Sequence, residues 1–536
     1  MAAEISEESV RSAKINRRKQ SGNKMGRVQK AAKNIFFGYI SNFMILILGF
    51  WQRDVFIRVL GETLLGVNTL YADILSVLSL AELGVGTALN YSLYKPVANR
   101  DYEKIKSYMR LYKRAYLTIA GVIAVIGLAV TPFLPLLIKA ESRSGIAVRE
   151  LVIYYLIFLF NTVSTYFVAY KYSLVNAEQK DYIQTNITTI TKIVTVCFQI
   201  IVLNITKSFF LYLLTHAVIE LLQKIAVSIY LNRLYPYLRE RNVEKLTREE
   251  TDIVVTKSKA LMFHKIGDVA RLQTDSIIIT YFIDVASVGF VGNYNYVITY
   301  GSNFINLIFN SVISGLGNLV ATESKEKQYR IFRVYRFFAC WLYGFAAVGF
   351  WLLLTPLIAG LWLDESWKLG QAVLSLILID FYFKGGRVVL LNYKIAAGVF
   401  EQDKYLSIIQ GGVNLVISII GARYIGLAGV YIGTVVSGVM ANLVRPVIIY
   451  RDCFARSAWE YFRDSLKYIA AILGILLLLI PVKKFLLARV NLFSFLLMAG
   501  IITIVYNLVF ICFFRKTEEF AYLLSVLGRK FRRKNG

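Results

Sequence analysis

The sequence predicts an all-α polytopic membrane protein with about fourteen transmembrane helices, arranged as two six-helix lobes in pseudo-twofold repeat and followed by two C-terminal helices. Three observations carry this prediction. Hydrophobic residues make up 57% of the 536-residue chain, and they gather in blocks of roughly 20 residues, enough to cross a hydrocarbon core of about 30 Å as helix. Lys and Arg cluster between these blocks, and the first half of the chain resembles the second.

The hydrophobic blocks are expected to be helices because a chain in lipid must satisfy its backbone polar groups within each segment. The expected spans are 34–57, 66–89, 114–138, 150–170, 182–203, 208–231, 261–283, 289–319, 334–361, 370–393, 405–423, 426–449, 465–482 and 492–514.

The distribution of Lys and Arg predicts the orientation of these spans, because cytoplasmic connections are enriched in both. The richest connections are 95–114, 232–260 and 321–336, and both termini are basic as well. Alternate connections, such as 284–288 and 362–369, carry few basic residues. We therefore expect both termini to be cytoplasmic; the 482–492 connection, with Lys483, Lys484 and Arg489, is the exception to the alternation.

The net charge of +27 does not indicate nucleic-acid binding, because the basic residues lie in the connections, where they act as topology signals and contact anionic lipids. The four cysteines have no paired spacing and are expected to be apolar fillers. Residues 1–33 are polar and basic and lack the apolar run of a cleavable signal. We therefore expect the first span to direct membrane insertion.

An internal repeat relates the two halves at an offset of 223 residues, which pairs Glu178 with Glu401. The same offset pairs Gly66 with Gly289, Tyr71 with Tyr294, Glu103 with Glu326, Arg110 with Arg333, Tyr112 with Tyr335 and Tyr170 with Tyr393. Spans 1–6 and 7–12 are therefore expected to be two copies of one unit, related by an axis along the membrane normal, with a central cavity between them. Such repeats indicate alternating-access transport more often than catalysis.

The spans and the repeat together predict the domain organisation. It consists of a basic cytoplasmic N-terminus (1–33), an N-lobe (34–231), a cytoplasmic linker (232–260), a C-lobe (261–450), two further spans (465–514) and a basic cytoplasmic tail (515–536).

Three stretches carry a resemblance to a known family: Gly49–Asp54 followed by Leu60–Glu62, then Leu80–Ala88, and Gly426–Thr434. With the fourteen spans and the repeat, they resemble the polysaccharide-exporter branch of the multidrug/oligosaccharidyl-lipid/polysaccharide (MOP) superfamily, which contains the O-antigen and capsule repeat-unit flippases. The first stretch also resembles the Gly-x-x-x-Arg-Asp signature of lipid II flippases. The resemblance covers about 35–514 and implies that spans 1, 2, 7 and 8 line the central cavity.

Charged residues within the spans mark candidate sites, because a charge in lipid is costly. They are Arg53 and Asp54 in span 1, His264, Asp268, Arg271 and Asp275 on one face of span 7, and Asp380, Lys384 and Arg387 on one face of span 10. Span 8 adds an uncharged stripe of Tyr296, Asn303, Asn306 and Asn310. Arginine suits bidentate phosphate contact, and amides suit sugar hydroxyls.

These residue types predict a substrate site for a phosphorylated sugar, in which Arg53 and Arg271 anchor a diphosphate. The predicted site comprises Arg53, Asp54, Arg271, Asp275, Asn303, Asn306, Asn310, Lys384 and Arg387.

Structural interpretations of the same residues stay open. Asp268–Arg271 and Asp380–Lys384 have the spacing of self-neutralising pairs that only hold helices together. Arg53 has the position of a residue that extends to the membrane interface, and the asparagine stripe suits helix–helix contact. Lys192 and the face of His216, Glu220 and Lys224 also fit a structural role.

The sequence favours a flippase, not an enzyme, that moves an undecaprenyl-diphosphate-linked oligosaccharide repeat unit across the bacterial cytoplasmic membrane for surface polysaccharide biosynthesis. A multidrug or cation-coupled extruder of the same superfamily is the alternative. No large external loop suggests a glycosyltransferase or polymerase, and no glycine-rich nucleotide loop suggests ATP hydrolysis. No cofactor is expected, and coupling to an ion gradient is left open. Expected partners are the lipid-linked glycan and anionic lipids, with a polysaccharide polymerase and glycosyltransferases as further candidates.

Overall fold

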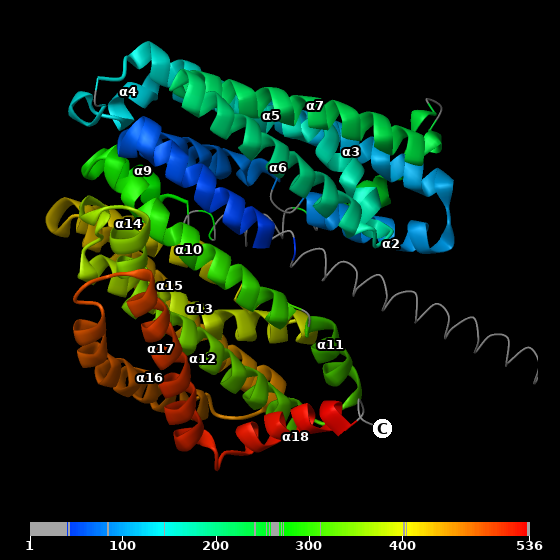
Figure 1. Cartoon of the computed structure of the whole chain (residues 1–536). Helices are drawn as coiled ribbons and strands as arrows, with labels where there is room; N and C mark the ends of the chain where they lie inside the picture. Colours follow the sequence, from blue (N-terminus) through cyan, green and yellow to red (C-terminus); the bar gives the residue numbers. More distant parts are fainter. Residues whose placement is uncertain are drawn as a thin grey trace, which may run out of the picture. The chain divides into compact units, whose positions relative to one another are not determined.

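Figure 1 shows the computed structural model of the chain, in which the regular secondary structure of the described residues is helical throughout. The structure describes residues 40, 43–82, 85–143, 145–240, 243–252, 254–256, 258, 267, 269, 271, 273–310, 312–399, 402–403 and 405–532. Within these residues, ten helices are long and apolar enough to cross a membrane. The predicted all-α polytopic class is confirmed, and the chain is a multi-pass membrane protein.

The first half of the chain contains four long helices that correspond to the expected spans 3–6. They are α3 (Tyr102–Val130), α5 (Val148–Ala177), α6 (Asp181–Thr206) and α7 (Phe209–Leu234), with the shorter α2 (Val85–Asn99) before them and α4 (Leu134–Leu137) after α3. Residues 43–78 are helical too, and Gly61, at the expected boundary between spans 1 and 2, has a φ of +78°. Glycine adopts this left-handed region without the strain of a side chain.

Helix α3 begins earlier than expected, at Tyr102, within the basic connection predicted at 95–114. A helix satisfies its own backbone in water as well as in lipid, so it does not have to end at the membrane surface. The basic side chains of its first turns also find acidic partners. Nζ of Lys104 lies 2.6 Å from Glu250, and Nζ of Lys106 lies 2.5 Å from Glu240.

In the second half, expected spans 8–14 correspond to described helices, whereas most of expected span 7 (261–283) lies outside the described residues, apart from its end in α9. This half contains α9 (Asp275–Phe282), α10 (Val285–Asn310), α11 (Ile313–Thr322), α12 (Lys325–Pro356), α13 (Gln371–Ala397), α14 (Leu406–Ile425), α15 (Leu427–Ile449), α16 (Trp459–Leu486), α17 (Leu492–Phe514) and α18 (Glu518–Arg532). Expected span 8 corresponds to α10 and α11, which together form one candidate membrane span, Val285–Thr322; Ser311, between them, lies outside the described residues. Lys483 and Lys484, two basic residues of the exceptional 482–492 connection, belong to the last turn of α16.

Contacts between residues divide the chain into two compact units, which are described separately. Unit 1 comprises Met1–Val59, Ala81–Leu128 and Leu156–Leu261, and unit 2 comprises Leu60–Leu80, Ala129–Tyr155 and Met262–Gly536. Most of α3 and α5, with α6 and α7, therefore belongs to unit 1, whereas α9–α18 belong to unit 2. The predicted lobe boundaries and repeat axis stay predictions.

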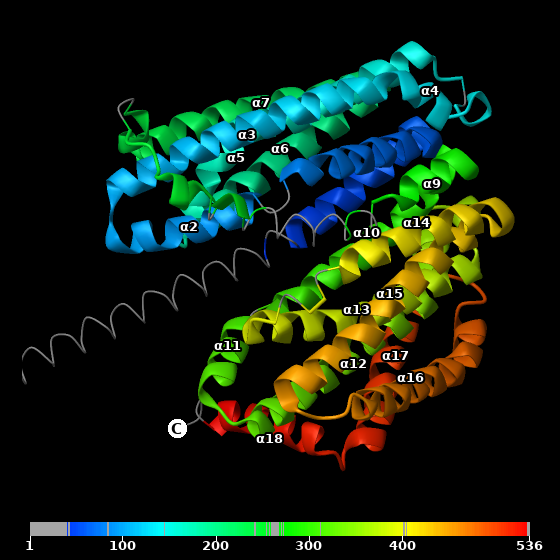
Figure 2. The same cartoon turned by 180° about the vertical axis from the view of Figure 1, so that it is seen from behind.

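In unit 2, α14 and α15 approach each other closely because glycines face each other. A Cβ added to Gly421 would lie 2.5 Å from the carbonyl oxygen of Gly429, a type of contact that small residues make possible between membrane helices. Helix α15 also packs against α13, which packs against α12; Figure 2 shows these helices from behind. This packing brings polar side chains of α13, α14 and α15 together inside the unit.

The two C-terminal spans are attached to α12 by aromatic side chains. Phe337 of α12 lies 5.5 Å, between ring centroids, from Phe510 of α17, and Trp341 stacks on the same Phe510 ring at 5.6 Å. Tyr468 of α16 belongs to the same buried cluster. Because aromatic side chains bury large apolar areas and favour such offset geometries, α16 and α17 form a stable layer on α12.

Candidate functional site

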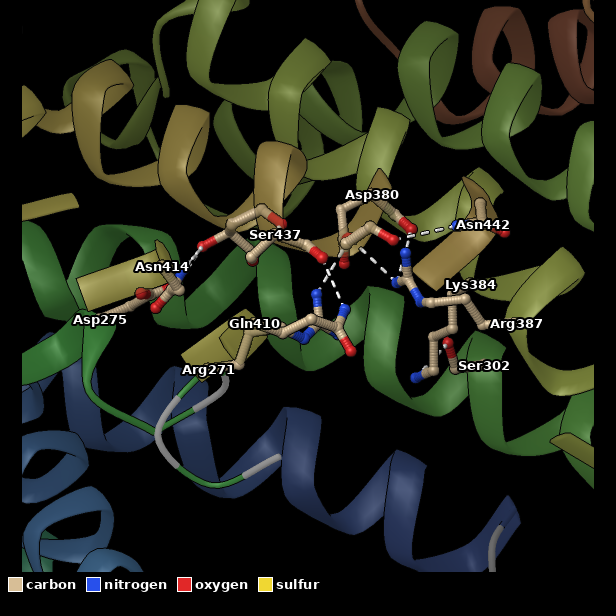
Figure 3. Close-up of polar contacts among 12 residues, drawn as sticks. Arg271, Asp275, Ser302, Asp380, Lys384, Arg387, Gln410, Asn414, Ser437 and Asn442 are labelled. Atoms are coloured by element: carbon tan, nitrogen blue, oxygen red, sulfur yellow. Dashed lines mark hydrogen bonds and ion pairs between the residues drawn. The ribbon is translucent and has the colours of Figure 1, made fainter. Parts of the chain in front are cut away.

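The side chains of Asp380, Arg387 and Arg271 meet in unit 2 (Figure 3). Oδ1 of Asp380, in α13, accepts a hydrogen bond of 2.9 Å from Nη2 of Arg387, two turns further along the same helix. Nη1 of Arg271, from the segment before α9, lies 3.3 Å from the same oxygen. The exposed fraction is 15% for Asp380, 10% for Arg271 and 9% for Arg387. One buried carboxylate thus compensates two buried guanidinium groups.

Lys384 adds a third cation to this cluster. Its Nζ lies 3.5 Å from Oγ of Ser302 in α10, and it interacts electrostatically with Asp380, Arg271 and Arg387. The self-neutralising alternative expected Asp380 to pair with Lys384. Asp380 instead forms its ion pairs with the two arginines. Nη1 of Arg387 is buried and has no hydrogen-bond partner among the described residues. The cluster therefore has an excess of positive charge and an unused donor.

Gly438 of α15 makes this arrangement possible. A Cβ at Gly438 would lie 2.3 Å from Oδ1 of Asp380 and 2.8 Å from Nη1 of Arg387. Both distances are shorter than non-bonded contacts allow, so any side chain here would displace the ion pair. The absent side chain lets α15 cover the charged groups closely and exclude water from one side of them.

A second polar group surrounds Asp275, the first residue of α9. Its Oδ2 accepts a hydrogen bond of 2.9 Å from Oγ1 of Thr434 in α15, and Nδ2 of Asn414 in α14 donates to the same hydroxyl at 3.2 Å. Oδ1 of Asp275 and Oδ1 of Asn414 are buried without a hydrogen-bond partner among the described residues. Oxygen atoms of this kind are the ligands that hard cations prefer, and an unpaired carboxylate oxygen can also accept a proton.

Sequence reasoning overlooked several polar residues that complete these groups. They include Ser302, Gln410, Asn414, Ser437 and Asn442, which are labelled in Figure 3, and Thr434, which bonds to Asp275 and Asn414. Nε2 of Gln410 donates to the carbonyl oxygen of Ser437 at 2.5 Å. A signal was present, because Gln410, Asn414 and Ser418 recur every four residues in an otherwise apolar span and so share one helix face.

The remaining predicted site residues have other surroundings. Asp54, in unit 1, accepts a hydrogen bond of 3.0 Å from Nε of Arg58, and Arg53 lies close enough to the Tyr212 hydroxyl to interact electrostatically with it. Oδ1 of Asn306 accepts a hydrogen bond of 2.6 Å from the hydroxyl of Tyr343, as expected for helix–helix contact. Asn303 and Asn310 are exposed on α10. His264 and Asp268 lie outside the described residues.

The fold and the site define a class: a helical multi-pass membrane protein with a buried, positively charged cluster inside one helical unit. No protein-family model and no curated protein sequence matches the chain. Its structure is similar to one described as the lipid II flippase MurJ in an inward closed conformation. The TM-score is 0.65 at 15% sequence identity, over 90% of this chain and 99% of that chain.

Two multidrug transporters are similar as well. One is a multidrug resistance MATE family transporter of the MOP superfamily in an inward-facing conformation, with a TM-score of 0.59, 16% identity, and coverage of 76% of this chain and 94% of that one. The other is a mutant of the Vibrio cholerae MATE transporter VcmN, with a TM-score of 0.54, 15% identity, and coverage of 80% and 98%. At these identities the similarity establishes the fold, which this chain shares with MurJ and the MATE transporters.

Proposed function

We propose that the chain is a flippase that carries an undecaprenyl-diphosphate-linked oligosaccharide repeat unit across the bacterial cytoplasmic membrane for surface polysaccharide biosynthesis, by alternating access and without catalysis. The observation that carries the proposal is the excess of cations around Asp380. Asp380 pairs with Arg271 and Arg387 and interacts with Lys384, and Asp275 also interacts electrostatically with Arg271, so three cations face two acids. A diphosphate would supply the negative charge that the cluster lacks.

The chemistry of the cluster suits a diphosphate better than an isolated charge. Guanidinium groups bind phosphate oxygens through two parallel hydrogen bonds, and Nη1 of Arg387 is available for such a bond. Asp380 holds both arginines in place before the anion arrives, which limits the cost of burying them. An inside-negative potential would then favour outward movement of the anion by about 2.3 kcal/mol per charge per 100 mV.

A lipid-linked substrate also needs an apolar surface for its chain, and unit 2 contains one. A groove of about 410 Å³ lies between α12, α13 and α16, lined almost entirely by apolar side chains such as Trp351, Ile379, Phe383 and Leu476. Because α13 also carries Asp380, Lys384 and Arg387, one helix links the groove to the charged cluster. We propose that the groove takes the first units of the prenyl chain.

The second candidate function is a cation-coupled multidrug extruder, and Asp275 favours it. A buried acid with an unpaired oxygen beside Thr434 and Asn414 suits a proton or a small cation. The fold similarity to MATE transporters fits both functions. The excess of positive charge around Asp380 disfavours cationic drugs as the cargo, so the flippase is the better supported proposal.

The variant Arg387→Ala tests the proposal in cells that lack the native protein. We expect surface glycan to fall about tenfold or more, because a charged hydrogen-bond donor of the substrate is lost, while an immunoblot shows normal membrane levels. Arg451→Ala is the matched control, since Arg451 is 69% exposed and pairs with Asp452. Full surface glycan in Arg387→Ala would contradict the flippase. Loss of drug resistance in this variant, with surface glycan unchanged, would favour the extruder.

A further inference from the structure

A polar cavity lies within unit 1, among α3, α5, α6, α7 and the short helix η1 (Ser79–Glu82). Its volume is about 450 Å³, within the range of about 300–1,000 Å³ that is usual for small-molecule sites. Twelve of its fifteen lining residues are polar or charged, whereas sites for drug-like molecules are mostly apolar. In a bundle of membrane helices, such a lining indicates a hydrophilic ligand.

The only cation of the lining is already held by neutral oxygens. Nζ of Lys224 donates to Oγ of Ser164 at 2.9 Å and to the carbonyl and side-chain oxygens of Asn161 at 2.9 and 3.0 Å. The nearest carboxylate oxygen of Glu220 is 3.9 Å away. Lys224 is therefore satisfied within the bundle, and its side chain is only 8% exposed.

Several other polar groups of the lining keep unused bonding capacity for a ligand. The Glu220 side chain is 30% exposed, lies 3.9 Å from Nζ of Lys224 and interacts electrostatically with Lys192. Oδ1 of Asn176 is buried without a hydrogen-bond partner there. Gln223 makes one long bond, 3.4 Å, to the hydroxyl of Tyr172. At the other side, Tyr116 hydrogen-bonds to Glu82.

We propose that this cavity binds an uncharged or amino sugar of the glycan, an inference that rests on the proposed flippase function. Carboxylates accept hydrogen bonds from sugar hydroxyls or amines, and amides offer both donors and acceptors. Glu220, Asn176 and Gln223 supply these groups from two helices, α5 and α7. Tyr116 and Tyr172 add aromatic rings with polar tips, which suit the mixed faces of a pyranose.

The charge of the cavity decides against other ligands. Glu82, Glu220 and Lys224 belong to the lining, and Lys192 of α6 interacts electrostatically with Glu220, so the acids and lysines around the cavity are equal in number and no cation is in excess. Without an excess cation, the cavity has no counter-charge to offer phosphate or a uronic acid, in contrast to the cationic cluster of unit 2. In the predicted topology, Asn176 and Gln184 lie near the cytoplasmic ends of α5 and α6. The sugar would therefore be bound from the side on which lipid-linked glycans are assembled.

Saturation-transfer NMR on the purified full-length protein in nanodiscs tests the inference. The probes are glucose, N-acetylglucosamine, glucosamine, glucuronate and inorganic phosphate, each at millimolar concentration. We expect at least one neutral or amino sugar to bind and the two anions to bind more weakly. Glu220→Gln and Gln223→Ala should each weaken sugar binding about tenfold, the effect of losing a hydrogen bond to a charged or fixed polar group. Glu249→Gln, which changes an exposed acid of unit 1, should leave it unchanged.

Two further variants separate this inference from the proposed function. Glu220→Asp keeps the negative charge and should regain part of the sugar binding that Glu220→Gln loses. A general folding defect caused by substitution at this position would not be relieved in this way. Arg387→Ala should bind the sugar as well as the wild type while it loses export. Binding of none of the three sugars, equal binding in Glu220→Gln, or tighter binding of glucuronate would overturn the inference. Sugar binding with normal export in Arg387→Ala would instead contradict the flippase.

Discussion

Single residues decide whether the charged cluster of unit 2 can form. Asp380 accepts bonds from two arginines, and Gly438 leaves the space in which these groups meet. The sequence placed Asp380, Lys384 and Arg387 on one helix face, as the structure shows for Asp380 and Arg387. It could not predict that Arg271 pairs with Asp380, because spacing along a chain says nothing about which neighbouring helix a face meets.

We predict that Gly438→Ala destabilises the protein and lowers export. The added methyl group would lie 2.3 Å from Oδ1 of Asp380, and overpacking of this kind costs about 1–3 kcal/mol. The measurement is the thermal unfolding midpoint of the purified variant, beside surface glycan in cells. Gly474→Ala is the control, because nothing lies within 4 Å of a Cβ at that position; equal midpoints for both variants would contradict the packing argument.

We also predict that Arg271→Lys loses export, although it keeps the charge. If Arg271 serves only as a counter-ion of Asp380, 3.3 Å away, lysine can replace it and transport persists. If it binds a diphosphate, lysine loses the planar fork that contacts two oxygens at once. Surface glycan, measured at equal membrane levels of variant and wild type, distinguishes the two roles, and full export in Arg271→Lys would assign Arg271 a structural role.

At the scale of elements, the sequence predicted the membrane helices better than their extensions into water. The expected bounds 492–514 coincide with α17, and 405–423 differ from α14 by a few residues, because hydrophobicity changes sharply where a span leaves lipid. The early start of α3 at Tyr102 was missed, since charged residues outside the membrane do not reveal whether the chain remains helical.

One such extension should respond to pH. Glu250 accepts hydrogen bonds from Nζ of Lys104 at 2.6 Å and from the backbone N–H of Thr247 at 3.0 Å. The backbone N–H of Glu250 in turn donates to the Thr247 hydroxyl, and the two bonds between Thr247 and Glu250 form a capping box. The Lys104 hydrogen bond, with the Thr247 bond, lowers the pKa of Glu250 below its ordinary value. The stability that these bonds of the Glu250 carboxylate contribute to the folded chain is therefore complete at pH values above the ordinary pKa of a glutamate. It is lost as the pH falls through the lowered pKa.

Hydrogen exchange measures this effect. We expect protection factors of the amides around Thr247 and Glu250 to decrease as the carboxylate is protonated, and Glu250→Gln to show the low protection at every pH. The change should be small, below about 1 kcal/mol, because the Lys104 side chain is 41% exposed and such pairs are screened by solvent. Protection that is independent of pH in the wild type would show that the cap does not depend on the charge of Glu250.

At the scale of the whole molecule, residues paired by the repeat have comparable surroundings. Tyr71 and Tyr294 are both fully buried. Each donates to a backbone oxygen near the start of the fourth expected span of its half, Tyr71 to Leu151 in α5 at 3.0 Å and Tyr294 to Trp367, just before α13, at 3.4 Å. Gly66 and Gly289 both permit close backbone contacts, since a Cβ at Gly289 would lie 2.8 Å from the carbonyl oxygen of Glu62. These correspondences support the predicted superposition of 34–231 on 257–450, which stays a prediction.

The orientation of the chain in the membrane is the last prediction, and reporter fusions test it. Fusions after Lys207, between α6 and α7, and after Glu365, between α12 and α13, should report the outside. A fusion after Lys245, between α7 and α9, should report the inside, because this connection carries Arg239, Lys245 and Arg248 whereas the connection between α6 and α7 carries only Lys207. In this orientation, the end of the proposed sugar cavity that carries Asn176 and Gln184 lies on the cytoplasmic side. An inside signal at Glu365 would therefore refute the topology, and it would also remove the reason for expecting the glycan to reach the cavity before translocation.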